Sequence, residues 1–292
     1  MAKFETTLYD GVIPESQIEV LHPKGVSTSN PFAPIHLKAL TTDAGVIPGK
    51  ALFIQGIDGD GNPEDIHIHT HSDAYLPISN RKAFETGQEI MTATGVDFHA
   101  QRMIWNGKKY IAEFIADTWK ADVLPGDAFA LGLQVQNSYD HSLVFGVQYF
   151  LCRLLCTNGM YVREQMGGFS FKHLKQNGDL IADATQRVML QSAQLPELAQ
   201  QFTAMTKVPA GLPMAQRWLS QMVNGTPKFP RSNVIDVLDA IEQPEIATVW
   251  DLYNAFTQVT SHELNPFTAP ELSNRVSNLA LAEVASATDN DV

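Results

Sequence analysis

The stretch that decides the fold is Leu-Gln-Val-Gln-Asn-Ser-Tyr-Asp-His-Ser-Leu-Val-Phe at residues 133–145, followed by Arg-Leu-Leu-Cys-Thr-Asn-Gly-Met at residues 153–160. Apolar and polar residues alternate before the Asn-Ser-Tyr-Asp-His turn and apolar residues resume after it, which predicts a hairpin with strands over 128–136 and 142–147. Residues 148–157 are then predicted to form a helix that ends at Asn158 and Gly159, because both residue types tolerate the left-handed conformation of a helix C-terminus.

Alternation upstream of this segment also predicts strands. Residues 51–54 lead into a turn rich in glycine and aspartate at 56–63, and residues 65–71 alternate strictly between two faces. The dipeptide Asn-Gly at 106–107 predicts a tight turn between strands over 102–105 and 110–116. A short helix is expected over 80–89, with Asn80 as its N-cap.

From about residue 177 the hydrophobic period becomes helical. Candidate helices span 179–194, 196–206, 213–223, 232–242, 244–262 and 270–286, and several have a proline near their start. The predicted fold class is α+β: an antiparallel sheet of hairpins with a few packed helices, followed by a helical C-terminal region. The predicted parts are an irregular N-terminal arm at 1–35, an α+β core at 36–176, a helical region at 177–286 and a frayed tail at 287–292.

The composition is that of an ordinary globular protein. The 292 residues are 44% hydrophobic and 18% charged, and the formal net charge of -12 argues against non-specific binding to DNA or to an anionic membrane over the whole surface. The two cysteines, Cys152 and Cys156, form no disulfide framework. The sequence shows neither an apolar signal segment nor a membrane span. We therefore expect a cytoplasmic protein with no membrane partner.

Cations and aromatic residues gather in two segments, the predicted hairpin at 102–110 and the stretch 153–175. Aromatic side chains beside cations on a sheet hold single-stranded nucleic acid without sequence preference. The alternative is that the aromatic residues belong to the core and the cations to a solvated opposite face. The candidate nucleic-acid-binding residues are Arg102, Trp105, Lys108, Lys109, Arg153, Tyr161, Arg163, Lys172 and Lys175.

Three histidines, His67, His69 and His71, occupy alternate positions of one predicted strand. Imidazoles are frequent metal ligands, so this row is a candidate metal site. On a regular strand, however, residues on one face repeat every 6.6–7 Å or so, which is too far for all three side chains to bind one ion. The alternative is a polar, solvent-facing side of the strand. No phosphate-binding loop, dinucleotide fingerprint or nucleophile elbow occurs, so we assign no catalytic residue and no cofactor.

Residues 137–142 (Asn-Ser-Tyr-Asp-His-Ser) and 153–160 resemble the Asn-Ser-His-Asp-Gly-Ser and Arg-x-x-Cys-x-Asn-Gly patterns of a phage/plasmid-like family, domain of unknown function 932. Residues 75–80, 171–173 and 249–254 resemble further segments of that family. The chain departs from the pattern at Tyr139, where histidine is usual, and at His141, where glycine is usual. The resemblance implies carriage on phages, prophages and plasmids and a role inside the host cell, and it supplies no catalytic residues.

Three functions follow as expectations. The first is an accessory protein of nucleic-acid metabolism that binds or anneals single-stranded DNA as a homo-oligomer. The second is a non-enzymatic structural or interaction protein of a mobile element that assembles or binds a host protein. The third is a metal-dependent enzyme that uses the histidine row. A non-enzymatic role is favoured, because no reaction follows from the residues.

Overall fold

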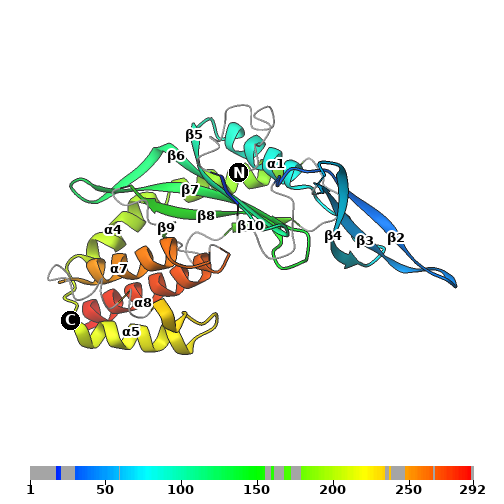
Figure 1. The fold of residues 1–292 in the computed structure, drawn as a ribbon. Helices are drawn as coiled ribbons and strands as arrows, with labels where there is room; N and C mark the ends of the chain where they lie inside the picture. The colour runs from blue at the N-terminus through cyan, green and yellow to red at the C-terminus, as the bar shows by residue number, and fades with distance from the viewer. Residues whose placement is uncertain are drawn as a thin grey trace. The chain divides into compact units, whose positions relative to one another are not determined.

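The computed structural model describes residues 18–20, 30–58, 60–154, 159–160, 168–171, 179–233, 237, 247–265 and 267–290. It contains two β-sheets and a helical C-terminal region, which confirms the α+β class (Figure 1). The residues group into two compact units that are discontinuous in sequence: the first comprises 1–115, 133–148 and 168–188, and the second comprises 116–132, 149–167 and 189–292. Within the described ranges, none of the helices combines the length and the hydropathy of a transmembrane segment.

The larger sheet has seven strands in the order β1-β5-β6-β7-β8-β10, with β9 also paired to β8. Its strands are β1 (Ile18–Val20), β5 (Phe98–Trp105), β6 (Lys109–Leu124), β7 (Asp127–Ser138), β8 (Phe145–Arg153), β9 (Gly159–Met160) and β10 (Gly168–Phe171). The turn at Asn106 and Gly107 joins β5 to β6, as the sequence predicts. Strand β1 lies within the segment predicted to be irregular and pairs with β5 in parallel.

The helix predicted over 148–157 is wrong where the structure describes it. Strand β8 continues to Arg153 and pairs with both β9 and β10 in antiparallel orientation. Tyr149, Phe150 and Leu151 are all buried, so β8 is apolar on both faces. A short run that is apolar on both faces lacks the alternation of a half-exposed strand and resembles a buried helix in sequence. Residues 155–158, including Cys156 and Asn158, lie outside the described ranges.

The smaller sheet is formed by β2 (Ile35–Thr42), β3 (Gly45–Ile57) and β4 (Pro63–His71), in the order β2-β3-β4 and antiparallel throughout (Figure 1). A β-bulge interrupts the β3–β4 pairing, since Phe53 pairs with His67 whereas the adjacent Leu52 pairs with His69. Ile68 is therefore the extra residue of β4. A bulge of this kind reverses the alternation of faces along the strand.

Helix α1 (Asn80–Ala93) begins one residue after its N-cap, Ser79, whose side chain accepts a hydrogen bond from the Lys82 amide. The predicted cap, Asn80, instead lies inside the first turn and is buried. The helix lies close to β7, because a Cβ atom at Gly87 would approach Cγ2 of Val135 to 2.4 Å. Glycine is therefore required at this point for the helix to contact the sheet.

The C-terminal helices are α3 (Asp179–Ser192), α4 (Leu195–Met205), α5 (Leu212–Asn224), α7 (Val249–His262) and α8 (Ala269–Asn290), with a short 3-10 helix η3 (Arg231–Asn233) after α5. The α7 helix starts at a capping box in which Thr248 and Asp251 bond each other's backbone amides. Helices α7 and α8 pack together through buried hydroxyls, including the pair Tyr253 and Ser277 at 3.0 Å. Most of the helix predicted over 232–242 falls outside the described residues, and α8 extends through 287–290 of the predicted tail.

Candidate functional site

Two segments of the first unit meet beside the end of β4. One is β4 itself, which carries His69 and His71, and the other is the turn between β7 and β8, which carries His141. The Ser138 side chain closes the turn. Its Oγ accepts a hydrogen bond from the Leu143 amide at 3.0 Å and donates one to the Leu143 carbonyl at 2.8 Å. His141 has φ of 61° and is the only non-glycine residue with a positive φ among those the structure describes.

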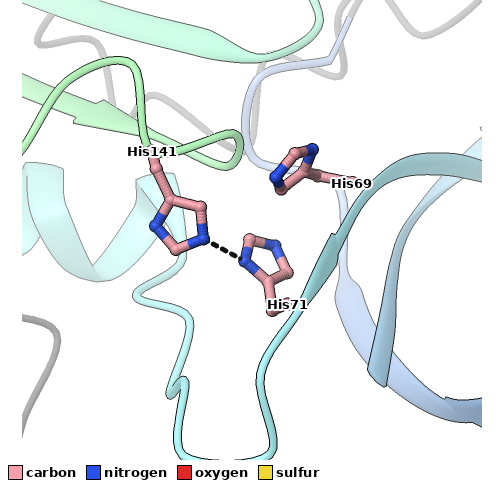
Figure 2. Close-up of side chains that lie close together, drawn as sticks. All are labelled: His69, His71 and His141. Atoms are coloured by element: carbon pink, nitrogen blue, oxygen red, sulfur yellow. Dashed lines mark hydrogen bonds between the residues drawn. The ribbon is translucent and has the colours of Figure 1, made fainter. Parts of the chain in front are cut away.

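The three imidazoles converge on one small region (Figure 2). His71 Nδ1 lies 2.6 Å from His141 Nε2, and the ring centroids of His69 lie 4.9 Å from His71 and 5.5 Å from His141. One ligand nitrogen from each histidine can be chosen so that all three lie within 4.8 Å of one another. His71 is buried, His69 is half-buried and His141 is exposed, so the cluster opens to solvent on the side of His141.

The β-bulge explains why only two members of the predicted histidine row take part. His67 faces the opposite side of the small sheet, where its ring contacts Phe53 edge-on at 5.5 Å. His69 and His71 lie beyond the bulge on the face that carries Leu52. The structure therefore brings together His69 and His71 of the row, excludes His67, and adds His141 from 70 residues further along the chain.

Tyr75 packs against two of the three imidazoles. Its ring is stacked on that of His71 at 3.8 Å with an interplanar angle of 5°, and it meets His141 edge-on at 4.7 Å. Burial, and then the negative charge of Asp140, raise the pKa of Tyr75 to about 12. The phenol is consequently neutral at physiological pH, and the stacked ring fixes the orientation of His71 without adding charge.

Asp140 precedes His141 and is half-buried. Burial favours its neutral form, but hydrogen bonds from Ser142 and the charges of Lys109 and Lys108 outweigh burial, so the pKa of Asp140 lies below its ordinary value. The Asp140 carboxylate is therefore ionised next to His141. It accepts hydrogen bonds from Ser142 and so stabilises the β7–β8 turn.

A buried polar network holds the two segments in place. Asn137 Nδ2 donates to Asn80 Oδ1 at 2.9 Å and to the Ile78 carbonyl at 2.8 Å. The backbone amide of Asn80 donates to the Tyr139 hydroxyl at 2.8 Å. The Asn80 side chain also donates to the Pro31 carbonyl at 2.8 Å. Because these groups are buried and hydrogen-bonded to one another, the network fixes the start of the β7–β8 turn relative to helix α1.

The arrangement fits a transition-metal ion. Imidazole suits zinc, copper, iron and nickel. In a tetrahedral site with metal–nitrogen bonds of about 2.0–2.1 Å, two ligand nitrogens lie roughly 3.3 Å apart. His71 and His141 must separate slightly from their 2.6 Å contact, and His69 must move inward. His141 is exposed and His69 is half-buried, so neither side chain is fully enclosed by its neighbours.

The nucleic-acid candidates are distributed differently from the prediction. Arg102 is bonded to buried Glu113, with Nε and Oε2 2.6 Å apart, and Gln134 donates to the same carboxylate at 3.0 Å. Trp105 is fully buried and packs against Tyr139, so its indole is not available to stack on a base. Among the candidates in the described ranges, Lys108 is exposed and Lys109 is half-buried.

Arg153 belongs to a buried cluster of the second unit. Its guanidinium donates to both carboxylate oxygens of Asp127, at 2.6 and 2.7 Å, and lies over the Trp250 ring at 5.5 Å. The Trp250 indole donates to the same carboxylate at 3.0 Å. The remaining candidates lie outside the described residues: Tyr161, Arg163, Lys172 and Lys175.

Comparison with known protein families identifies the family of this chain. The model of a family described as Domain of unknown function (DUF932) matches residues 67–283, which is more than half of the chain. The chain belongs to this family. No curated protein and no solved structure is significantly similar to it. The DUF932 match includes all three clustered histidines.

The structure gives physical roles to the DUF932 segments found in the sequence. The segments at 75–80 and 137–142 meet through Tyr75 and through the bond between Asn80 and Asn137. The arginine at 153 and the tryptophan at 250 meet through Asp127. His141 could have been suspected from sequence, because a histidine stands where the DUF932 pattern has a glycine. Its meeting with His69 and His71 depends on the fold and has no local signal.

Proposed function

We propose that this protein binds a divalent transition-metal ion, with zinc as the first candidate, through His69, His71 and His141. The observation that carries the proposal is the convergence of three imidazoles from β4 and the β7–β8 turn, with ligand nitrogens within 4.8 Å of one another. The facing nitrogens of His71 and His141, 2.6 Å apart, can share one proton, and a metal ion would take its place and bind all three rings.

The backbone of His141 supports the same interpretation. A non-glycine residue in the left-handed region costs of the order of 1–3 kcal/mol and persists where the surroundings require it. At 61° the φ of His141 lies in that region, and the resulting turn directs the imidazole toward His71. Metal coordination would offset this strain, because metal-binding free energy adds to the stability of the folded state.

The ligand set favours a site with an open position. Structural zinc sites generally use four protein ligands, whereas catalytic sites use three and leave the fourth to water or to substrate. The group found within the described residues has three histidines and no fourth ligand. The fourth position would thus lie on the solvent-facing side, near exposed His141. A zinc ion in such a site lowers the pKa of bound water to about 7.

The test is metal analysis of the full chain purified without a histidine tag. We expect close to one zinc per chain in the wild-type protein, and loss of the metal in the His71→Ala and His141→Gly variants. His67→Ala is the matched control, because His67 belongs to the same strand but faces the opposite side of the sheet. Wild-type protein that takes up neither Zn²⁺ nor Co²⁺, or equal metal content in all three variants, would falsify the proposal.

The other functions remain predictions. Single-strand binding now depends on Lys108, Lys109 and the four candidates outside the described residues, because Arg102 and Arg153 are engaged in ion pairs. A role in assembly, or in binding a host protein, also remains a prediction. Phage or plasmid carriage is an expectation from the sequence resemblance alone.

A further inference from the structure

Three lysines lie on segments that are hydrogen-bonded to the two segments carrying His69, His71 and His141. Lys50 belongs to β3, and Lys108 and Lys109 belong to the turn between β5 and β6. The two lysine-bearing segments are far apart in sequence, and each is joined by backbone hydrogen bonds to a segment that carries one or two of the histidines. The protein as a whole carries a formal charge of -12, so a group of lysines here is locally distinctive.

Lys50 is the direct cross-strand partner of His71 in the β3–β4 register. Directly opposed residues of an antiparallel pair share one face, and their Cβ atoms lie about 4.5–5.5 Å apart. The half-buried Lys50 side chain therefore projects from the same face as His69 and His71.

Lys108 and Lys109 are placed by a turn that is bonded to the β7–β8 turn. Asn106 Oδ1 accepts the amides of Lys108 and Lys109 at 3.1 and 2.8 Å, and the Lys108 carbonyl accepts the Tyr139 amide at 2.8 Å. The turn that carries both lysines is thus bonded directly to the residue at the start of the β7–β8 turn, which carries His141.

Among the described residues, the acidic groups on the same segments are Asp140 and the exposed Asp73, whose carboxylate accepts a hydrogen bond from the Gly49 amide at 3.2 Å. Three lysines against two carboxylates leave a small positive excess, and a divalent ion adds two further positive charges. A site with an open metal position and this charge favours an anion over a neutral ligand.

We propose that the metal centre binds the phosphoryl group of a small phosphate monoester, with one oxygen in the open metal position and the others facing Lys50, Lys108 and Lys109. This inference rests on the proposed metal site. A phosphate monoester carries close to two negative charges at neutral pH and three terminal oxygens, so it can meet a metal ion and several ammonium groups at once. Lysine binds phosphate groups through a single positive charge at the end of a flexible side chain.

The experiment uses the full chain loaded with Co²⁺, whose visible absorption reports the coordination of the ion. Inorganic phosphate and glycerol 3-phosphate are the probes, and acetate and dimethyl phosphate are the comparison anions. We expect the two dianions to change the cobalt spectrum at lower concentration than the monoanions. Equal effects of phosphate and acetate would overturn the assignment of a phosphoryl ligand.

Lysine variants separate the contribution of the lysines from that of the metal. We expect phosphate affinity to fall about threefold in Lys50→Gln and about tenfold in the Lys108→Gln/Lys109→Gln double variant, as suits partly exposed charge pairs. The exposed Lys120 of β6 provides the control variant Lys120→Gln, with affinity unchanged. Unaltered affinity in all the lysine variants would contradict the proposed ligand.

The two proposals fail in different ways. If the wild-type chain binds no Co²⁺, the metal site itself is wrong. If it binds Co²⁺ with the expected dependence on His141 and phosphate leaves the spectrum unchanged, the metal site stands and the phosphoryl inference alone is wrong.

Discussion

His71 Nδ1 and His141 Nε2 lie 2.6 Å apart, although 70 residues separate them in the sequence. The contact joins the last residue of β4 to the turn that follows β7, and it places one buried and one exposed imidazole side by side. A bond between the two rings links the small sheet to the β7–β8 turn within the first unit. A metal ion at this place would therefore act as a cross-link as well as a site.

The cross-link predicts metal-dependent stability. Added Zn²⁺ is expected to raise the free energy of unfolding of the wild-type protein by about 2.7 kcal/mol when free zinc is a hundredfold above the dissociation constant. The His141→Gly variant is expected to show no such rise, and without metal to be about 1 kcal/mol more stable than the wild type, because glycine relieves the left-handed strain at φ of 61°. Urea unfolding with zinc and with a chelator measures both effects. Equal zinc stabilisation of the two proteins would contradict this prediction.

Arg153 provides a test of its structural role. The Arg153→Ala variant leaves the Asp127 carboxylate buried beside the Trp250 indole and without its ion-pair partner, which is expected to cost about 3–5 kcal/mol of unfolding free energy. The Asp127→Leu/Arg153→Met double variant removes both charges and is expected to lose much less. Urea unfolding of the two variants provides the comparison. If Arg153→Ala unfolds like the wild type, the ion pair is not a structural element and a role in binding an anion becomes the better explanation.

The close approach of α1 to β7 predicts the effect of a single methyl group. In Gly87→Ala the new Cβ would lie 2.4 Å from Cγ2 of Val135, so we expect a loss of about 1–3 kcal/mol through overpacking. Val135→Ala in the same chain removes the obstructing methyl groups and should restore part of the loss. A thermodynamic cycle of the two single variants and the double variant measures the coupling. Simple additivity would mean that the helix moves away from the strand without strain.

Tyr253 predicts a loss of stability at alkaline pH. Complete burial raises the pKa of its phenol above the ordinary value of 10, so the folded state holds the proton more tightly than the unfolded state. The free energy of unfolding should therefore fall as the pH rises above 10, when the unfolded state begins to lose this proton. Tyr253→Phe is expected to lessen that slope, at a cost of about 1 kcal/mol for the lost hydrogen bond to Ser277. An unchanged slope between pH 9 and 11 would show that other groups determine the alkaline transition.

The fold was predictable where local pattern and tertiary packing agree. The apolar run in β3, the alternation in β4, the Asn106-Gly107 turn and the apolar stripe of α7 all form the elements that the sequence indicates. Strand β8 was not predictable in this way, because Tyr149, Phe150 and Leu151 are buried on both faces and lose the alternation that marks a half-exposed strand. The N-cap of α1 lies at Ser79, one residue before the expected Asn80, since Asn80 bonds Asn137 and Pro31 instead.

The candidate site was predictable only in part. Histidines at alternate positions marked β4 as a place to examine, and two of the three belong to the cluster. The third partner, His141, comes from a distant turn that only the pairing of the strands brings near. The ion pairs of Arg102 and Arg153 could not be inferred either, because neither acidic partner is a local neighbour in sequence. Charge counted along the sequence therefore overstated the number of cations available to a ligand.

The extra residue in β4 shifts the residues that follow it in the strand to the opposite face. His67, which precedes Ile68, lies on one face of the small sheet, and His69 and His71, which follow it, lie on the other face. A one-residue deletion at Ile68 would make the strand regular and place His67 next to His69 in sequence, so His67 would still lie on the face opposite to His69 and His71. We expect that chain to keep its metal, as a metal titration of the deletion variant would test. Histidines at alternate positions of a relative are thus insufficient to diagnose the site, and the pairing of each histidine with β3 is the character to compare.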